Sequence, residues 1–207
     1  PIDNIQVQLI DTPPLSEEHI EPDLMSLIRR ADLLLLLVDL QAYPIEQLED
    51  TLAILEAYHI APSHRRPHYD EPFRWRFIPT LILANKVDDE TLDEDFQVLC
   101  ELLDEDWIIL PISAERGRYF DQLKAAVFEH LKIIRVYSKP PGKKADLSAP
   151  FVMRRGGTVE EFAGHVHRDF LQKLQSARIW GEGVYDGQPV SREHVLHDGD
   201  IVELRVS

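Results

Sequence analysis

The sequence is poor in cysteine, with Cys100 as its one thiol in 207 residues. A disulfide within the chain is therefore excluded, which favours a reducing compartment, and the amphipathic stretch around Cys100 predicts a buried structural thiol. Long apolar runs are lacking too, because the longest, over residues 31–38, is interrupted by Asp32 and falls far short of the ~20 residues of a membrane span. No secretory leader precedes it, so we expect a cytoplasmic protein with no membrane contact.

Basic residues are scarce in the first two thirds of the chain. Residues 1–135 hold 27 Asp and Glu against 12 Lys and Arg, whereas residues 136–207 hold 10 of each, and the formal net charge is −15. An acidic surface repels phosphate backbones at long range. We therefore expect any nucleic-acid contact to come from the neutral C-terminal part.

The composition that is present, 44% hydrophobic and 29% charged residues, is that of a globular protein, and the length suits two small domains. The first residue is Pro1 and not Met, which suggests that upstream sequence has been removed. Apolar runs and spacing predict strands at 5–10, 33–38, 78–83 and 107–111 and helices at 21–30, 45–58, 92–103 and 120–131. A polar, Pro- and His-rich stretch over 61–76 is interpreted as an exposed insertion. The alternation predicts an α/β domain over residues 1–132, with a mostly parallel sheet covered on both faces.

The pattern changes from residue 133 onward. Short strands predicted at 133–137 and 149–153 flank a Pro/Gly/Lys loop and indicate a hairpin. Thr158 and Glu161 have the spacing of a capping box, which predicts the start of a helix. Further extended segments are predicted at 177–180, around Val190 and at 201–206. Strands around one helix predict a small α+β domain over residues 133–207.

Three short polar segments each follow a predicted strand. They are Asp11-Thr12-Pro13-Pro14, Asn85-Lys86-Val87-Asp88 and Ser113-Ala114-Glu115-Arg116-Gly117. Ligands of open α/β sheets bind at the carboxyl ends of the strands. We therefore expect all three segments to line the edge where a nucleotide would bind.

The second segment resembles the NKxD guanine-specificity motif of the Ras-like GTPases, and Ser113-Ala114 resembles their SA motif. The resemblance implies that the carboxylate of Asp88 accepts hydrogen bonds from guanine, that the stem of Lys86 covers the base, that Asn85 ties the loops together and that the Ala114 amide donates to the base carbonyl. Only guanine presents two adjacent donors to one carboxylate. The predicted guanine site is therefore Asn85, Lys86, Asp88, Ser113 and Ala114, with GTP or GDP as ligand; a solvated loop that carries the same tetrapeptide is the alternative.

Asp11 matches the aspartate of the DxxG motif of the same GTPases, and the resemblance implies that it holds Mg²⁺ through a water. The alternative is that Asp11 only caps the preceding strand. Pro14 stands where that motif has a glycine whose amide contacts the γ-phosphate, and proline has no N–H to offer. Sensing of the γ-phosphate through that amide is therefore excluded.

The sequence also has no G-x-x-x-x-G-K-[ST] motif, so the amides and the lysine that cradle phosphates are lacking. The resemblance implies a partial Ras-like P-loop GTPase domain without its P-loop strand. That strand would lie between the predicted strands 5–10 and 33–38, which without it would face an empty slot or close on each other. We expect no catalytic residue in this chain and no hydrolysis of GTP by it unaided.

The C-terminal part closely resembles the TGS domain of the Obg-type developmentally regulated GTP-binding (DRG) proteins. The matching segments are residues 136–140, 157–162, 167–170, 177–181 and 197–202. The resemblance covers residues 133–207 and implies a ubiquitin-like β-grasp fold that docks on the ribosome, on tRNA or on a regulatory protein. Two functions stay open: the guanine-nucleotide-binding part of a TGS-containing regulatory GTPase, associated with translation, or a nucleotide-independent protein- or RNA-docking module with a degenerate G domain.

Two weaker signals have plain interpretations. His64 and His68 have the spacing of a zinc pair, with His59 nearby, but no Cys-x-x-Cys accompanies them and a solvated loop is favoured. Arg154-Arg155 with Lys143-Lys144 could form a basic face for RNA, yet no aromatic residues are interleaved as a stacking platform requires.

Overall fold

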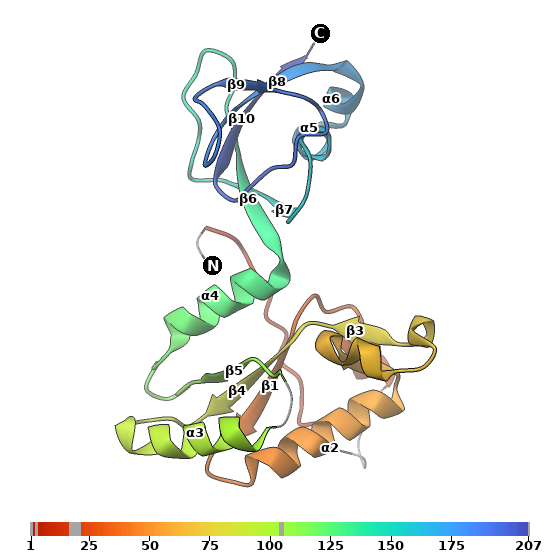
Figure 1. Ribbon diagram of the computed structural model, residues 1–207, viewed down its shortest axis with the longest axis vertical. Coiled ribbons are helices and arrows are strands. Elements are labelled where there is room, and N and C mark those ends of the chain that lie inside the picture. The colour runs from red at the N-terminus through yellow and green to blue at the C-terminus, as the bar shows by residue number, and fades with distance from the viewer. Residues whose placement is uncertain (1, 3, 17–21, 104–105, 207) are drawn as a thin grey trace. The chain divides into compact units, whose positions relative to one another are not determined.

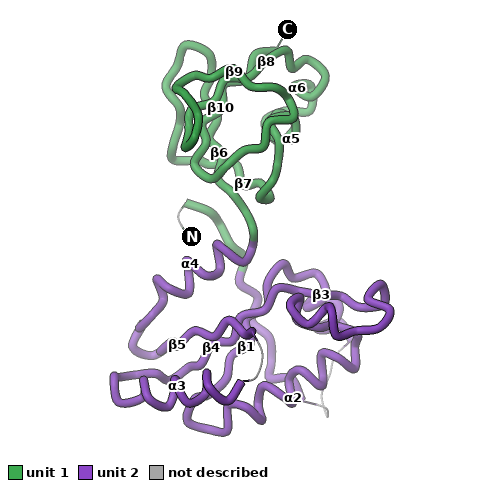
Figure 2. The backbone as a smooth tube through the Cα atoms, in the orientation of Figure 1, with its two compact units in different colours: residues 1–8, 132–207 green, residues 9–131 purple. Residues whose placement is uncertain are grey.

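The computed structural model describes residue 2 and residues 4–16, 22–103 and 106–206 (Figure 1). The chain divides into two compact units, one of residues 9–131 and one of residues 1–8 with 132–207 (Figure 2). Each unit has its own apolar core. None of the helices that the structure describes is both long enough and apolar enough to cross a membrane.

The unit of residues 9–131 alternates strands and helices. In chain order its elements are α1 (Pro22–Ile28), β1 (Leu34–Asp39), α2 (Pro44–Ala57), β2 (Ile60–Pro62), the 3₁₀ helices η1 (Ser63–His68) and η2 (Pro72–Arg74), β3 (Arg76–Ile78), β4 (Thr80–Asn85), the 3₁₀ helix η3 (Glu90–Leu92), α3 (Asp93–Leu102), β5 (Ile109–Pro111) and α4 (Phe120–Leu131). β1, β4 and β5 form a parallel sheet in that order, and Asp39 pairs with Asn85. The carboxyl ends of the three strands therefore lie at one edge.

β4 is the central strand of this sheet, and its apolar sequence explains its place. A strand covered on both faces needs apolar residues at successive positions, and residues 80–84 are all buried. Ile82 and Ala84 pack in a cluster with α2 and α3 on one face. Leu81 and Leu83 point to the other face, on which α4 lies (Figure 1). The expected parallel α/β arrangement is present.

The strand predicted at residues 5–10 is wrong. Residues 6–16 have no regular structure, Leu9 is 78% exposed and Ile10 is 50% exposed. A strand needs a neighbour to bond its amides and carbonyls, and within the described residues no strand pairs with this segment. The expected closure of this segment on β1 therefore does not arise, and the outer edge of β1 has no described strand beside it.

β1 forms as predicted, but as an edge strand and not as a buried one. It pairs with β4 alone among the described strands, and Leu37 is 58% exposed. The row of backbone groups on its other edge bonds to no described strand. Its apolar sequence thus suits a strand with neighbours on both sides, which this sheet does not supply.

The stretch predicted as an exposed insertion is only partly exposed. β2 and β3 pair in parallel, and Ile60 and Ile78 are fully buried in a cluster with α1 and α2. These apolar residues border a polar middle, formed by η1 and η2, none of whose residues is buried. Ile60 and Ile78 lie just outside the predicted stretch of residues 61–76, and the prediction failed only at its first border, where Ala61 and Pro62 are buried.

The prediction of a buried thiol is wrong, because Cys100 is exposed. α3 buries a single stripe, in which Phe96 and Leu99 pack against the core of the sheet. Leu102 lies off this stripe and is 59% exposed. A short helix on one face of a sheet covers only such a stripe, so the amphipathic stretch did not decide the side on which the thiol lies.

The other unit is a five-stranded sheet with two helices. Its elements are β6 (Ile133–Ser138), β7 (Phe151–Arg154), α5 (Val159–Val166), α6 (Arg168–Lys173), β8 (Leu174–Trp180), β9 (Gln188–Val190) and β10 (Asp200–Val206). The order is β7-β6-β10-β8-β9; β6 and β10 are parallel and the other pairs antiparallel. The predicted hairpin of β6 and β7 is confirmed.

α5 begins at the predicted capping box. The Thr158 hydroxyl accepts a hydrogen bond of 3.3 Å from the Glu161 amide, and the Glu161 carboxylate accepts one of 3.3 Å from the Thr158 amide. Phe162 on this helix is fully buried at the centre of the apolar core. α6 was not predicted, because six residues are too few to show a helical period.

Candidate functional site

The candidate site begins where β4 ends. Asn85 is the last residue of that strand, and Lys86 turns the chain with a φ of +71°. A non-glycine residue in this left-handed region costs free energy and is held only by its surroundings. Here the Val87 amide donates a hydrogen bond of 3.0 Å to the carbonyl of Ile112, and the Val87 side chain is fully buried. The loop is thereby fixed against the end of β5.

A second loop follows β5 and is bonded to the first. Ser113 is fully buried, and its hydroxyl donates a hydrogen bond of 2.6 Å to Asp88 Oδ1. The Arg116 amide donates to the Ser113 hydroxyl at 2.9 Å. Ser113 is therefore a spacer between the loops that orients the Asp88 carboxylate. No hydrogen bond to Asp88 Oδ2 is found within the described residues.

Asn85 makes the second bond between the loops. Its Oδ1 accepts a hydrogen bond of 3.0 Å from the Ala114 amide. The resemblance implies such a bond between the loops for Asn85. The same resemblance, however, implies that the Ala114 amide donates to the carbonyl of the base, and here that amide already donates to Asn85. Ala114 is exposed, and one N–H can be shared between two acceptors in a three-centre bond. The base carbonyl would have to approach in that way.

Lys86 is held by an acidic residue that the sequence analysis missed. Its Nζ lies 2.5 Å from Asp39 Oδ2, at the end of β1. The hydrogen bond between them lowers the pKa of Asp39 and raises that of Lys86. Gln41 supports the pair, since its amide donates to Asp39 Oδ1 at 3.0 Å and its side chain donates to the Lys86 carbonyl at 3.3 Å. The sequence did contain a signal for Asp39, because an acidic residue directly follows the strand predicted at residues 33–38.

Arg118 is a further supporting residue. Its guanidinium donates a hydrogen bond of 3.2 Å to the Val87 carbonyl, and its own carbonyl accepts one of 3.3 Å from the Ser113 amide. Between them Gly117 adopts a φ of +69°, which closes the turn with a hydrogen bond from its amide to the Ser113 carbonyl. Nothing in the spacing of the sequence marked Arg118.

The structure brings together all five predicted guanine-site residues but not Asp11. Asp11 is exposed and follows no strand. In the described part of the chain, no group of three or more His, Cys, Asp or Glu side chains could hold a metal ion. A Mg²⁺ ion held through water by one carboxylate needs no such group, so the role of Asp11 stays a prediction. His64, which the sequence analysis weighed as a zinc ligand, lies edge-on to Trp107 at 4.4 Å.

Comparison with known proteins identifies the C-terminal part. Residues 134–206 match the family model of the TGS domain. An uncharacterized GTP-binding protein of Methanocaldococcus jannaschii is 37% identical over 131 residues, or 62% of this chain and 33% of that protein. The developmentally-regulated GTP-binding protein 1 homolog of Dictyostelium discoideum is 33% identical, and the ribosome-interacting GTPase 1 of Saccharomyces cerevisiae is 28% identical, each over 62% of this chain and 34% of that protein.

The predicted relation to the DRG proteins and the predicted TGS domain are thus confirmed by sequence. The chain spans about a third of the length of the curated relatives that it matches. Among solved structures, the crystal structure of a GTP-binding protein from Pyrococcus horikoshii OT3 matches with a TM-score of 0.60 at 16% identity, over 86% of this chain and 80% of that one. At this identity the likeness concerns the fold alone.

Proposed function

We propose that this chain, which carries a TGS domain and is homologous to the DRG proteins, supplies the base-recognition part of a guanine-nucleotide site. One observation carries the proposal. The loops after β4 and β5 are joined by the bonds Ser113 to Asp88 and Ala114 to Asn85, at 2.6 and 3.0 Å. Two separate strand ends thus act as one rigid surface, with a carboxylate, a lysine stem and a backbone amide.

The chemistry of this surface suits guanine. The Asp88 carboxylate has acceptor capacity on both oxygens beyond its bond to Ser113, and guanine presents a ring N–H beside an amino group. Adenine lacks the ring N–H at that edge, so the carboxylate would be left without a donor. A site that hydrogen-bonds its ligand rejects such an analogue strongly, because a polar group would lose water without a partner.

Lys86 would cover one face of the base with its apolar stem. Its ammonium lies against Asp39, so the four methylene groups are held at the edge of the sheet. Long basic side chains bury their stems in this way while the charged end stays in water. The left-handed turn at Lys86 is the backbone feature that allows this placement.

The phosphates and the metal ion belong to the complete protein in this proposal. The chain lacks the G-x-x-x-x-G-K-[ST] motif, and Asp11 as a water-mediated ligand of Mg²⁺ stays a prediction. We infer a partial Ras-like P-loop GTPase domain over residues 1–132 and a β-grasp TGS domain over residues 133–207. The complete protein would bind GTP or GDP in the cytoplasm, while this chain alone would not hydrolyse GTP.

The TGS domain is proposed to dock the protein on a translation partner. The relative in Saccharomyces cerevisiae is named a ribosome-interacting GTPase, and its similarity to this chain supports a ribosomal partner here. tRNA and a regulatory protein are the other partners that the TGS resemblance implies.

The second candidate function is a docking module that needs no nucleotide. Pro14 in the DxxG-like segment and the missing phosphate-binding motif favour it, because both remove contacts to phosphates. Under this hypothesis the α/β part is a scaffold, and the loop bonds at Asp88 and Asn85 only hold it together.

Base specificity separates the two functions. The chain is titrated with guanosine, adenosine and xanthosine, which avoid the phosphates and should bind weakly, in the millimolar range. We expect the unchanged chain to prefer guanosine. Asp88→Asn should prefer xanthosine, because an amide can donate to the carbonyl that xanthine has in place of the amino group, and each preference should be roughly tenfold.

Asp121→Asn is the matched control. Asp121 lies on the exposed surface of α4, where its carboxylate pairs with Lys124 at 2.9 Å. The control should retain the preference for guanosine. Equal binding of all three nucleosides by the unchanged chain, or none by any variant, would remove the nucleotide hypothesis and leave the docking module.

A further inference from the structure

The charges of the unit of residues 9–131 are segregated. The unit holds 26 Asp and Glu and 10 Lys and Arg. Six of the ten basic residues, all arginines, lie in two short segments: Arg29, Arg30, Arg65, Arg66, Arg74 and Arg76. The stretch of residues 59–77, called here the arginine–aromatic insertion, contains only two acidic residues, Asp70 and Glu71. A basic surface is thus set into an acidic unit.

The fold brings the two arginine segments together. Arg76 Nε donates a hydrogen bond of 3.0 Å to the carbonyl of Arg29, and the Arg29 guanidinium donates to the carbonyl of Tyr58. The end of α1 therefore lies beside β3 and the insertion. The insertion leads into β4 at Thr80, so this surface lies at the opposite end of that strand from Asn85, roughly 17 Å away. It is separate from the guanine site.

Aromatic side chains are interleaved with the arginines. Tyr69 and Trp75 lie 4.2 Å apart between ring centroids, and the guanidinium of Arg66 lies over Phe77 at 5.8 Å. The Tyr69 hydroxyl donates a hydrogen bond of 2.5 Å to Glu56 on α2, which fixes this cluster to the body of the unit.

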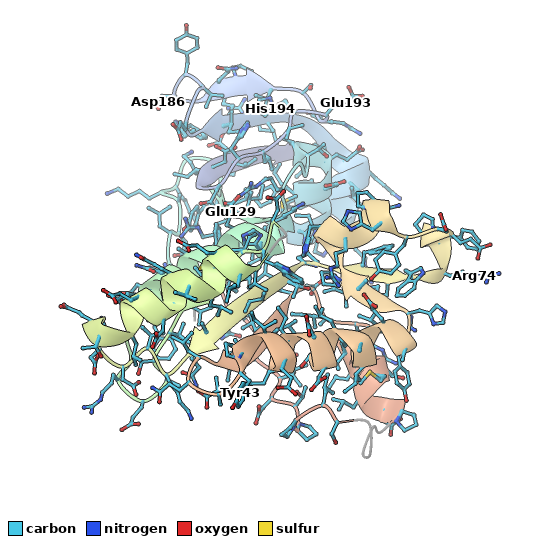
Figure 3. The ribbon with its side chains drawn as sticks, turned by 60° about the horizontal axis from the view of Figure 1, so that its bottom comes forward. Tyr43, Arg74, Glu129, Asp186, Glu193 and His194 are labelled. Atoms are coloured by element: carbon cyan, nitrogen blue, oxygen red, sulfur yellow. The ribbon has the colours of Figure 1, made fainter. Side chains whose placement is uncertain are left out.

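The outer end of the insertion is the most exposed part. Phe73 is 79% exposed, and the guanidinium of Arg74 lies over its ring at 5.8 Å. Figure 3 shows Arg74 at the outer end of the insertion, pointing into solvent. An exposed aromatic ring beside arginines adds little to the core, so folding alone does not account for it.

The ion pair of Arg74 does not account for its place on this surface either. Arg74 pairs with Glu71 at 3.1 Å and Arg65 with Glu56 at 3.3 Å. The first pair is more than half exposed on both sides. An exposed pair of this kind contributes about 0–1 kcal/mol, too little to account for Arg74 at this position.

We propose that the arginine–aromatic insertion, with the end of α1, is a binding surface for RNA. Arginine rather than lysine suits this ligand, because its planar guanidinium both pairs with phosphate oxygens and stacks on bases. Phe73 supplies a ring on which an unpaired base stacks. The acidic side chains of a polypeptide would use the arginines but have no ring to stack on Phe73. RNA binding at this surface would run against the expectation that nucleic-acid contacts come from the C-terminal part.

Fluorescence anisotropy with a 5′-fluorescein single-stranded RNA of about 20 nucleotides tests the proposal. The full chain is measured at about 50 mM and about 200 mM salt. We expect binding that weakens with salt. The Arg66→Glu/Arg74→Glu variant should lose at least roughly tenfold in affinity and show a smaller salt dependence, since two phosphate contacts are removed.

Two further variants separate stacking and net charge from this effect. Phe73→Ala should weaken binding roughly fivefold or more while the salt dependence stays unchanged, because stacking involves no counterions. Lys124→Glu/Lys173→Glu is the matched control, since it reverses two exposed lysine charges outside the insertion and should retain most of the affinity. Thermal unfolding followed by circular dichroism checks that each variant is folded.

Three results would overturn the proposal. The first is no binding of the RNA at low salt, and the second is an equal loss of RNA affinity in the two double variants. The third is full RNA affinity in Phe73→Ala together with displacement of the RNA by polyglutamate at equal charge. The last result would assign the surface to an acidic protein. If the double reversal at Arg66 and Arg74 prevents folding, Phe73→Ala decides in its place, and full affinity in that variant would then overturn the proposal.

Discussion

The two units differ in how their sheets are completed. In the unit of residues 132–207 the first and last strands, β6 and β10, pair at the centre of five strands, and α5 packs against the sheet. Its two edge strands, β7 and β9, are short, with four and three residues, whereas β1 has six. In the unit of residues 9–131 the sheet has three strands, and β1 bonds to no described strand on its outer edge.

The difference teaches where stability and function lie. The TGS unit buries Phe162 and its neighbours in a core that a self-contained sheet encloses. The α/β unit instead uses hydrogen bonds between loops to hold the edge that carries the candidate site, as between Ser113 and Asp88. We therefore expect large effects from core changes in the first unit and small ones from changes on the open edge of the second.

The largest effect is expected from Phe162→Ala. Phe162 is fully buried, and truncating a buried phenylalanine costs about 3–5 kcal/mol. Denaturant unfolding measures the loss, and amide hydrogen exchange should show it in β6, β8 and β10. Leu81→Ala on β4 is the corresponding change at a buried residue of the other unit. A loss of less than about 1 kcal/mol in the free energy of unfolding for Phe162→Ala would contradict the difference drawn between the two units.

An intermediate effect is expected from Glu203→Gln in β10. The hydrogen bond from Lys139 lowers the pKa of Glu203, whose side chain is 7% exposed. A lowered pKa in the folded state stabilises the fold above the ordinary pKa of the carboxyl, and this stabilisation is lost as the pH falls. Removing the charge should cost about 1–2 kcal/mol near neutral pH.

The pH dependence sharpens that test. The cost of Glu203→Gln should shrink between about pH 5 and pH 3, as the carboxyl of the unchanged chain takes up its proton. Asp200 acts in the opposite direction, because burial raises its pKa. Asp200 is present in both the unchanged chain and Glu203→Gln, so its contribution cancels in the difference between their free energies of unfolding. A cost that stays constant down to pH 3 would contradict the role given to Lys139 and Glu203.

The smallest effect on stability is expected from Leu37→Lys on β1. Leu37 is 58% exposed, so the change should alter the free energy of unfolding by about 0.5 kcal/mol or less. A lysine on an open edge hinders edge-to-edge pairing, so self-association at high concentration should fall. Light scattering measures it, with Leu171→Lys on α6 of the other unit as control. A large loss of stability in Leu37→Lys would show that the outer edge of β1 is packed against other residues and not open.

The strands that find their partners inside the chain could be predicted from sequence. β4 and β6 follow from apolar runs with clear borders, and α5 follows from the capping box of Thr158 and Glu161. The segment of residues 5–10 has the same kind of pattern but no described neighbour to pair with. A pattern within one strand carries no information about whether its partner is present.

The site was predictable where a motif carried it. Asp88 and Ala114 follow from two short motifs at strand ends, and the structure places them at one edge. Asp39 and Arg118 were missed because their contacts depend on the parallel register of β1 with β4 and on a turn closed by Gly117. Contacts set by register and by local turns do not leave a spacing in the sequence.

The most direct test of the central claim is an amide NMR titration of the full chain with guanosine and with adenosine. The account predicts that guanosine shifts the resonances of Lys86, Asp88 and Ala114 while adenosine leaves them in place. Equal shifts with both nucleosides, or none with guanosine at millimolar concentration, would contradict guanine recognition at this edge.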